Sequence, residues 1–330
     1  MTAPQRDPLA ELAGTTALVI GDVMVDAYLW GRVDRISPEA PVPVVQVRER
    51  SARLGGAANV ALNMKALGAE PVVITVIGDD DHARTVERLF LEQGLATDGL
   101  VHSPARRTTV KTRVISGHQH IVRVDEEQED DLGTEDAQRL IEKVTGLLHR
   151  LRPAVVVIED YDKGVLTEVT IEGILSAARS AGVPVAVDPK KRNFLDYQGV
   201  ALFKPNLKEL KEGLKLDVDP REPGHLAAAV ETLEQLLGND ISMVTLSEHG
   251  TYIHQQGVVH HVPAHHRKIA DVSGAGDTVI AVAALALAQG MPIKRIADLA
   301  NLAGGLVCEE VGVVPIDPVR FRRECDRLGL

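Results

Sequence analysis

Residues 271–278, DVSGAGDT, place Gly274 and Gly276 directly before the apolar run VIAVAALALA of residues 279–288. The apolar run predicts a buried helix, and the glycines before it allow backbone conformations that other residues avoid. The first turn of a helix carries unpaired amide groups and a partial positive charge, so a bend of this kind can bind an anion. The spacing alone is also compatible with a simple turn that an aspartate caps.

Asp277 favours the anion-binding interpretation of this bend. A carboxylate inside an anion site is repelled by the ligand, so it is expected there only when the chemistry requires it. The role that fits is to accept the proton of a hydroxyl group that attacks a phosphoryl group. We therefore expect Asp277 to be the general base of a phosphoryl-transfer site.

The composition limits the partners of the chain. Its 330 residues include 36 basic and 47 acidic ones, a formal charge of −11, and 3% aromatic residues. An acidic chain without a basic tract or stacking aromatics is a poor ligand for nucleic acid or an anionic membrane. The two cysteines, Cys308 and Cys325, and the histidine pairs at 260–261 and 265–266 lack metal-ligand spacing, so no zinc site is expected.

No secretory or membrane segment is expected either. The first residues, MTAPQRDPLAELAGTT, contain no basic start followed by an apolar core, as a signal peptide would. The longest apolar run, residues 279–288, is about half the length of a membrane span. These features indicate a cytoplasmic protein.

Apolar strand-like runs alternate with helix-like segments along most of the chain. This order is typical of an α/β sandwich of three layers, in which helices cover both faces of a mostly parallel central sheet. The predicted strands are residues 16–22, 71–80, 154–160, 183–189 and 241–250, with a β pair at 251–262. The predicted helices are residues 55–69, 81–94, 167–182, 204–214, the run after the opening motif, 292–310 and 316–328.

Two segments break this alternation. Residues 108–127 alternate between apolar and polar around a Ser-Gly-His turn, which predicts an antiparallel hairpin. Residues 40–50 are strand-like, but Pro41 and Pro43 confine them to a sheet edge. We expect a small β lid formed by about 22–50 and 106–126. Because no Ser/Gly-rich linker divides the chain, we expect one domain over residues 1–330.

Four aspartates follow apolar strands: Asp22, Asp79, Asp160 and Asp188. The carboxyl ends of parallel strands point at the ligand crevice, where acids are good partners for sugar hydroxyls and Mg²⁺. One such aspartate is usually a cap or a turn residue, but four in one chain favour a binding site. Asp22 and Asp26, four residues apart, can bracket a polyol.

Three motifs resemble those of the ribokinase-like (PfkB) carbohydrate kinases. DVSGAGDT resembles the second signature of that family, D-T-x-G-A-G-D, and GGAANVA at 55–61 resembles the Gly-Gly-x-x-x-Asn part of the first. These two lie about 215 residues apart, in the expected order. Between them, KPNLKEL at 204–210 matches an N-x-x-E element. Val272, Ser273 and Lys208 depart from the residues that are common in the family.

A narrower resemblance concerns bacterial heptose-7-phosphate kinases. It rests on residues 21–45, GDVMVDAYLWGRVDRISPEAPVPVV, and on EDYDKGVLT at 159–167, and it extends over roughly residues 12–315. It implies ATP-dependent phosphorylation of the anomeric hydroxyl of D-glycero-D-manno-heptose 7-phosphate, which gives the 1,7-bisphosphate on the route to ADP-heptose for lipopolysaccharide. Many such kinases are fused to a nucleotidyltransferase domain. Because this sequence ends at Leu330, we expect the stand-alone form.

The resemblance also implies roles for single residues. Asp277 would be the base, and the amides of Gly274, Ala275 and Gly276 would hold the charge on the transferred phosphate. The implied sugar-binding residues are Asp22, Asp26, Gly55, Gly56 and Asn59, with Asp160 added from the strand ends. The implied nucleotide residues are Asn206 and Glu209 beside the triphosphate and its Mg²⁺, Ser247 and Gly250 along the nucleotide, and Asn301 near the adenine. A monovalent cation near Asp271 and a homodimer through the lid are implied as well.

A sugar that already carries a phosphate requires cations to bind it. Lys111 and Arg113 point to the same face of the predicted hairpin, and Arg123 lies on the opposing strand. We expect these three, together with Lys163, to bind the distal phosphate, since arginine can do so with two parallel hydrogen bonds. The alternative is that they form a solvated lid surface, as we expect for Arg106 and Arg107.

Two other functions remain open from the sequence. One is a kinase of the same fold that acts on another sugar, nucleoside or sugar phosphate. The other is a regulator that binds sugar or nucleotide without catalysis, although such a protein has no need of Asp277. A nicotinamide dehydrogenase is disfavoured because no G-x-G-x-x-G follows the first strand.

Overall fold

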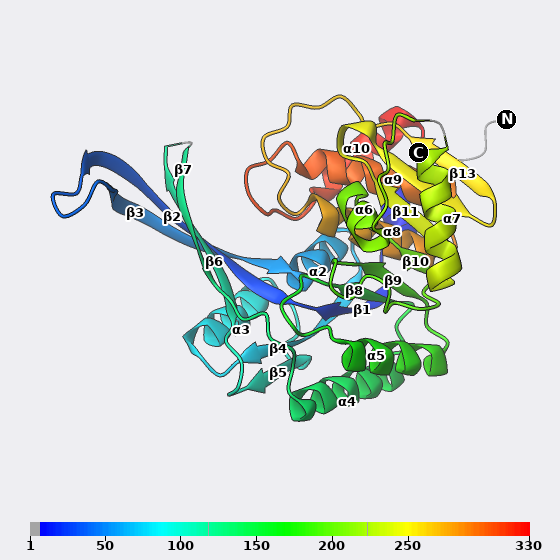
Figure 1. The fold of residues 1–330 in the computed structure, drawn as a ribbon, viewed down its shortest axis with the longest axis horizontal. Coiled ribbons are helices and arrows are strands. Elements are labelled where there is room, and N and C mark those ends of the chain that lie inside the picture. The colour runs from blue at the N-terminus through cyan, green and yellow to red at the C-terminus, as the bar shows by residue number, and fades with distance from the viewer. Residues whose placement is uncertain (1–6, 118, 223) are drawn as a thin grey trace.

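The computed structural model describes residues 7–117, 119–222 and 224–330 (Figure 1). Its centre is a nine-stranded sheet in the order β13-β12-β11-β10-β9-β8-β1-β4-β5. All neighbouring pairs from β5 to β11 are parallel, whereas β12 and β13 pair antiparallel at one edge. The strands are β1 (Thr16–Gly21), β4 (Glu70–Gly78), β5 (Leu100–Ser103), β8 (Val155–Glu159), β9 (Val185–Asp188), β10 (Leu202–Phe203), β11 (Ile241–Thr245), β12 (Thr251–Gln255) and β13 (Val258–Val262).

Helices cover both faces of this sheet because its inner strands are apolar on both sides. In β8, for example, Val155 and Val157 pack into one core and Val156 and Ile158 into the other. The first core is shared with α1 (Pro8–Leu12), α2 (Ala57–Ala66), α3 (Asp81–Glu92), α8 (Ala275–Ala288), α9 (Ile293–Val307) and α10 (Pro318–Leu328). The second is shared with α4 (Thr134–Leu151), α5 (Glu168–Ala181), α6 (Leu207–Leu214) and α7 (His225–Leu237). The predicted three-layer α/β fold is confirmed.

The helix that follows the opening motif, α8, lies in the interior of the first layer. Every residue from Asp277 to Ala286 is buried, and most of these side chains are alanine or valine. Such small side chains let α2 and α9 pack closely against it. The N-terminus of α8 is thereby fixed above the carboxyl ends of β8 and β9.

A second sheet projects from the body as an arm (Figure 1). We call it the lid sheet. Its strands are β2 (Val23–Ile36), β3 (Pro43–Gly56), β6 (Thr109–Ser116) and β7 (Gln119–Glu126), in the order β3-β2-β6-β7. The predicted hairpin is the antiparallel pair β6–β7, although His118 of its turn lies outside the described residues. The strand predicted at 40–50 is at an edge, as its prolines require, but it continues to Gly56.

The lid sheet begins where the central sheet ends. A single residue, Asp22, separates β1 from β2, so the side chains at the root of the arm face the carboxyl ends of the central strands. The glycine pair, predicted at the start of a helix, ends β3 instead, and α2 begins at Ala57. Because β3 ends at the glycine pair and α2 begins directly after it, the first predicted motif lies at the junction of the lid sheet and the body. Within the described parts of the chain, no helix is long and apolar enough to cross a membrane.

Candidate active site

The bend before α8 has the geometry of an anion site. Gly274 caps the helix with φ 79°, and a Cβ there would lie 2.9 Å from the Asn59 amide nitrogen, so glycine is required. Gly276 faces the Asp188 carboxylate, with room for a Cβ at 3.5 Å. First-turn amides have no acceptor within their own helix, although the Ala275 amide makes a 3.3 Å bond to the Val272 carbonyl. The bend itself is partly exposed, so an anion can reach it.

Asp277, the third residue of α8, is held by two neutral donors. The Asn59 amide donates to its Oδ2 and the Tyr161 hydroxyl to its Oδ1, each at 2.7 Å. Burial raises the pKa of this carboxyl, and the two hydrogen bonds oppose that rise. Asn59 is itself fixed, because Asn63 donates to its main-chain oxygen at 2.9 Å. The first and second motifs, 218 residues apart, therefore meet at the carboxylate of Asp277.

Tyr161 was not predicted, and Asp22 explains its position. The two oxygens of Asp22 accept the amides of Tyr161, Lys163 and Val165 at 2.9 to 3.2 Å. Burial, and then the charge of Asp160, raise the pKa of Asp22 to about 6. In this structure Asp22 shapes the loop of residues 161–165, and its direct contact with a sugar stays a prediction.

Asp26 and the glycine pair lie at the root of the lid sheet. Asp26 is buried and forms an ion pair with Arg113. A Cβ on Gly55 would overlap the Asp26 carboxylate, and one on Gly56 would overlap the Asp22 carbonyl oxygen. The glycines thus allow β3 to approach both aspartates closely.

A buried charged floor lies beneath the bend. Lys204 Nζ and Asp188 Oδ2 form an ion pair at 2.8 Å, and both side chains are almost fully buried. Glu159 is opposite Asp188 in the strand register, and neither of its oxygens has a hydrogen-bond partner among the described residues. Burial, then Asp188 and Asp277, raise the pKa of Glu159 well above its ordinary value. Of Lys204, Asp188 and Glu159, only Asp188 was singled out from the sequence.

The N-x-x-E element forms the N-terminus of α6. Asn206 and Glu209 cap each other, with the Glu209 amide on Asn206 Oδ1 at 2.9 Å and the Asn206 amide on Glu209 Oε2 at 2.8 Å. Glu209 Oε1 accepts from Lys190 Nζ at 2.7 Å. Burial disfavours the charge of Lys190, but Asp188 and Glu209 outweigh it and raise the pKa of Lys190. Lys190, which was not predicted, places a cation beside this element.

The remaining predicted nucleotide residues follow β11. Asn206 bridges to Thr245 at the end of that strand, so the elements lie side by side. Ser247 is exposed with φ 52°, and Gly250 has φ 87° with its α-carbon against the Val262 carbonyl. Asn301 accepts from the Thr251 hydroxyl at 3.2 Å and donates to the Pro263 carbonyl at 3.0 Å.

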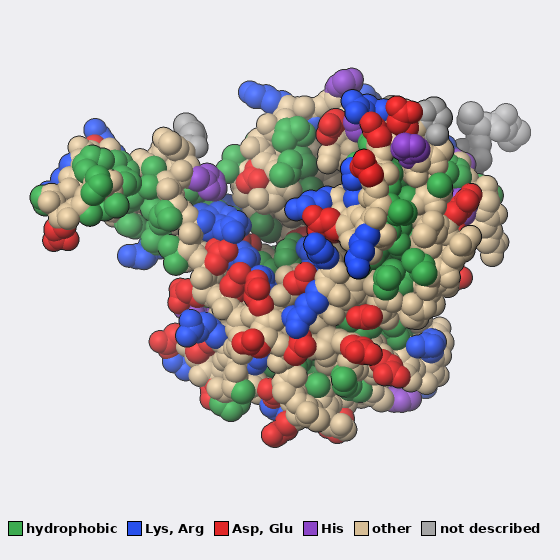
Figure 2. Space-filling model, viewed as in Figure 1, with side chains coloured by type: hydrophobic (Ala, Val, Ile, Leu, Met, Phe, Trp, Pro, Cys, Tyr) green, Lys and Arg blue, Asp and Glu red, His purple; other side chains and the backbone are tan. Residues whose placement is uncertain are grey.

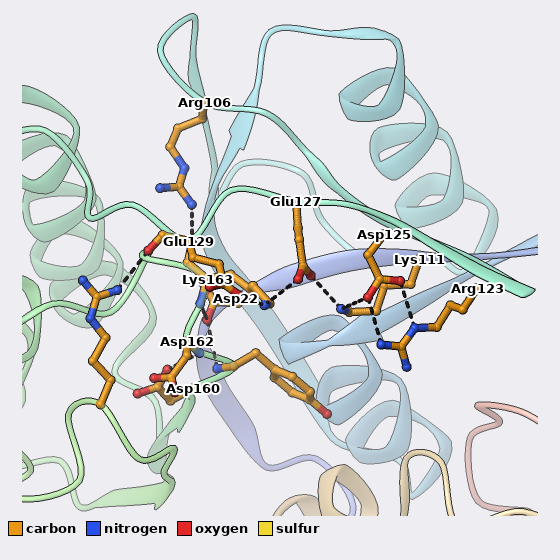
Figure 3. Close-up of polar contacts among 12 residues, drawn as sticks. Asp22, Arg106, Lys111, Arg123, Asp125, Glu127, Glu129, Asp160, Asp162 and Lys163 are labelled. Atoms are coloured by element: carbon orange, nitrogen blue, oxygen red, sulfur yellow. Dashed lines mark hydrogen bonds and ion pairs between the residues drawn. The ribbon is translucent and has the colours of Figure 1, made fainter.

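The four predicted phosphate-binding cations all have acidic partners, and Figure 3 shows those of Lys111, Arg123 and Lys163. Lys111 pairs with Asp125 and Glu127, and Lys163 pairs with Glu127 and Glu129, at 2.6 to 3.4 Å. Arg123 makes two 2.9 Å hydrogen bonds to Asp125, and Arg113 binds Asp26. Glu127 joins the lid sheet to the loop of Lys163; burial disfavours its charge, but hydrogen bonds from Lys111 and Lys163 lower its pKa.

Two sequence interpretations are wrong in detail. Arg106 is not a free surface residue, because it donates to the main-chain oxygens of Asp130 and Lys163. Asp79 is exposed, and its neighbour Asp80 instead caps α3 and binds the Thr108 amide. Asp160 is buried and accepts hydrogen bonds from Tyr197 and Asn193 at 2.6 and 3.2 Å, and its contact with a sugar stays a prediction.

Asp271, near which a monovalent cation is expected, is bound by backbone amides. Asp271 accepts the amides of Ser273 and Gly312, both at 2.9 Å. In the described parts of the chain, no three acidic, histidine or cysteine side chains are grouped as a metal would require. Glu209, the predicted acidic group beside Mg²⁺, has its two oxygens bound to Lys190 and to the Asn206 amide, and its role beside a metal ion stays a prediction.

A mostly parallel sheet, a projecting β lid and a carboxylate in the first turn of a glycine-capped helix define an enzyme that transfers a phosphoryl group to an alcohol. The sequence profile of the pfkB family carbohydrate kinases matches residues 15–319, and the chain belongs to this family.

Curated relatives and solved structures are consistent with this assignment. The chain is 41% identical to "Bifunctional protein HldE" of Paramagnetospirillum magneticum over 92% of its own length and 61% of the relative. It is 45% identical to the protein of the same name from Caulobacter vibrioides, over 93% of its own length and 63% of the relative. The chain thus spans about three-fifths of the length of these relatives.

Two solved structures share the fold. Phosphofructokinase-2 from Escherichia coli in complex with potassium has a TM-score of 0.75 at 18% identity, covering 96% of this chain and all of that one. Ribokinase of Arabidopsis thaliana complexed with ribose and ATP has a TM-score of 0.71 at 17% identity, covering 94% and 99%.

Proposed function

We propose that this carbohydrate kinase transfers the γ-phosphate of ATP to the anomeric hydroxyl of D-glycero-D-manno-heptose 7-phosphate. The observation that carries the proposal is the buried Asp277 carboxylate at the glycine bend, held by Asn59 and Tyr161. The resemblance of residues 21–45 and 159–167 to heptose-7-phosphate kinases supports heptose as the sugar. The product would feed the synthesis of ADP-heptose for lipopolysaccharide, in the cytoplasm where ATP is available.

The proposed reaction is a direct displacement. Asp277 accepts the proton of the sugar hydroxyl, and the hydroxyl oxygen forms a bond to the γ-phosphorus. The bond from that phosphorus to the bridging oxygen breaks, and its electron pair leaves with ADP. The amides of Gly274, Ala275 and Gly276, at the partly exposed bend, would stabilise the charge that develops on the transferred group. Each oxygen of Asp277 accepts one hydrogen bond from the protein, which leaves a lone pair for the proton.

The nucleotide is proposed to lie along the ends of β9, β10 and β11. Lys190 and the capped start of α6 at Asn206 and Glu209 would face the phosphates, and Ser247, Gly250 and Asn301 the nucleoside. Mg²⁺, when bound, would neutralise phosphate charge, with Glu209 as the acidic group beside it. A monovalent cation near Asp271 belongs to the same proposal.

The distal phosphate is proposed to bind among Lys111, Arg113, Arg123 and Lys163. In the structure these cations are balanced by Asp125, Glu127, Glu129 and Asp26. Figure 2 shows acidic and basic side chains mixed where the arm meets the body. A dianionic phosphate would compete with these acids for the cations, and a neutral sugar has no group to do so. Because four acids match the four cations, the net charge of the cluster does not select a sugar phosphate, and this choice of substrate rests on the resemblance of residues 21–45 and 159–167.

A homodimer through the lid sheet is also proposed. Along β7, Arg123 and Asp125 point to one face, so Val122 and Val124 point to the other. These valines are 51% and 49% exposed, and Ile36, which ends β2, and Val42, which precedes β3, are exposed as well. Figure 2 shows hydrophobic side chains gathered on the arm. A second copy of the lid sheet would cover them.

A panel of acceptors tests the proposed substrate. The protein is incubated with Mg-ATP and heptose 7-phosphate, unphosphorylated heptose, fructose 6-phosphate or ribose, and ADP release is measured. We expect the highest kcat/KM for heptose 7-phosphate, with the new phosphate at the anomeric position by ³¹P NMR. Faster turnover of another acceptor would identify a kinase of different specificity. Sugar binding without turnover of any acceptor would favour a non-catalytic regulator.

A further inference from the structure

Tyr161 occupies a special position between the two halves of the candidate site. Its hydroxyl donates to Asp277 Oδ1 at 2.7 Å, and its ring lies 5.1 Å from Lys190 Nζ. Lys190 in turn binds Glu209 at the start of α6. One side chain thus contacts both the carboxylate at the bend and the cation on the nucleotide side.

The surrounding backbone holds Tyr161 rigidly in this position. Its amide and those of Lys163 and Val165 are bound by the buried carboxylate of Asp22. Arg106 binds the carbonyl of Lys163 from the other side. A loop fixed by a buried carboxylate and an arginine cannot easily turn the ring away.

The ring also separates two opposite charges. Asp277 and Lys190 are close enough to interact, since Lys190 lowers the pKa of Asp277, but Lys190 makes its ion pair with Glu209. If the ammonium group were bound directly to Asp277, the carboxylate would be a weaker base and the cation would be lost to a phosphate. Tyr161 gives the carboxylate a neutral donor instead.

We propose that Tyr161 is a positioning residue for Asp277: its hydroxyl holds the carboxylate ionised and oriented, and its ring keeps Lys190 apart from it. The proposal rests on the proposed role of Asp277 as the base. Other charged groups face Asp277 from the strands below: Glu159 from β8, Asp188 from β9, and Lys190 and Lys204 from the segments after β9 and β10. Asn59 of α2 is neutral. Tyr161→Phe removes only the hydroxyl and keeps the ring beside Lys190, so the effect of the hydrogen bond to Asp277 can be isolated.

The first test needs no substrate. Protein labelled with ¹³C at aspartate carboxyl groups is titrated by NMR, and the Asp277 signal is identified by its loss in Asp277→Asn. Because the Tyr161 hydrogen bond favours the ionised form, Tyr161→Phe should raise the titration midpoint of Asp277. Tyr197→Phe is the matched control, since it removes a similar buried hydroxyl from Asp160. This control should leave the Asp277 midpoint unchanged, and an unchanged midpoint in Tyr161→Phe would overturn the proposal.

The second test uses the kinase reaction. Tyr161→Phe should lower kcat by about tenfold, the size expected for a hydrogen bond to a charged group, with KM for the sugar within about twofold. The acidic limb of its pH–rate profile should move to higher pH, so the loss is greater at pH 6 than at pH 8. Tyr161→Ala, which removes the ring as well, should lose more. A rise in KM with unchanged kcat would assign Tyr161 to sugar binding and overturn the proposal.

The two tests separate this inference from the proposed function. If the wild type phosphorylates none of the acceptors but the Asp277 midpoint rises in Tyr161→Phe, the proposed function fails and the role of Tyr161 in holding the carboxylate is supported. If the wild type is active and both variants match it, the inference fails and the proposed function is retained.

Discussion

Lys204 and Asp188 form a buried ion pair of 2.8 Å directly beneath the bend at Gly276. The lysine follows β10 and the aspartate ends β9, so the pair ties two neighbouring strands to the start of α8. The groups around this ion pair are charged or polar residues of the candidate site. Removing one member of a buried ion pair strongly destabilises the folded protein.

Lys204→Met is expected to lower the free energy of unfolding by about 3–5 kcal/mol, because it leaves Asp188 buried without its partner. Urea denaturation measures this change. Lys208→Met provides the comparison, since Lys208 is exposed on the same segment and should alter stability by less than about 0.5 kcal/mol. Similar small effects of both substitutions would contradict the structural role of the pair.

Asp22 predicts a pH-dependent contribution to stability. Its pKa rises from 3.8 to about 6 on folding, so its protonated form favours the folded state, and that contribution is lost as the pH rises through about 6. Compared with Asp22→Asn, the wild type should therefore lose stability between pH 4 and pH 7 by an amount on the order of 3 kcal/mol. The difference between the two unfolding free energies, measured at several pH values, cancels the contributions of groups that do not interact with Asp22. If the difference in unfolding free energy between the wild type and Asp22→Asn does not change with pH, the pKa of Asp22 is not raised in the folded protein.

Lys163 is predicted to recognise the phosphate that the sugar already carries. Lys163→Met should raise KM for heptose 7-phosphate by about tenfold and leave kcat nearly unchanged, because the lost charge acts on binding rather than on transfer. Unphosphorylated heptose should show no such change. Lys191→Met is the control: this lysine is exposed and lies outside the cluster. Equal effects on both sugars would place the phosphate elsewhere.

The lid sheet is predicted to be the dimer contact. Replacing Val122 and Val124 by glutamate should convert the dimer to a monomer, because charged groups would then face the partner. Light scattering after size-exclusion chromatography measures the mass. Val169→Glu, at a valine of α5 that is 62% exposed, should leave the dimer intact. A monomeric wild type would rule out this contact.

The fold could be predicted to a large extent because its signals are local. Apolar runs gave most of the central strands but not the short β5 and β10, and the glycine bend marked the start of α8. Helix α4 was missed although Leu140, Val144, Leu147 and Leu148 have helical spacing, so its signal was present and unused. The glycine pair was misplaced because glycine ends strands as readily as it begins helices, and only close contact with Asp22 decides between them.

The candidate site could be predicted only in part. Motif residues such as Asn59 and Asp277 were found because their patterns are distinctive, and they meet in the structure. Tyr161 and Lys204 lie within the quoted stretches EDYDKGVLT and KPNLKEL but were not singled out there, and Lys190 lies in no quoted motif. The positions of all three depend on contacts across distant strands. The cations were identified, but their pairing with Asp125, Glu127 and Glu129 depends on how the lid sheet lies over the body.

The central claim is that Asp277 removes the proton from the attacking hydroxyl. The most direct measurement is the turnover of Asp277→Asn with Mg-ATP and the preferred sugar, combined with calorimetric measurement of sugar binding. We predict a loss in kcat by a factor on the order of 10² or more, with sugar affinity largely retained. Turnover equal to that of the wild type would contradict the account.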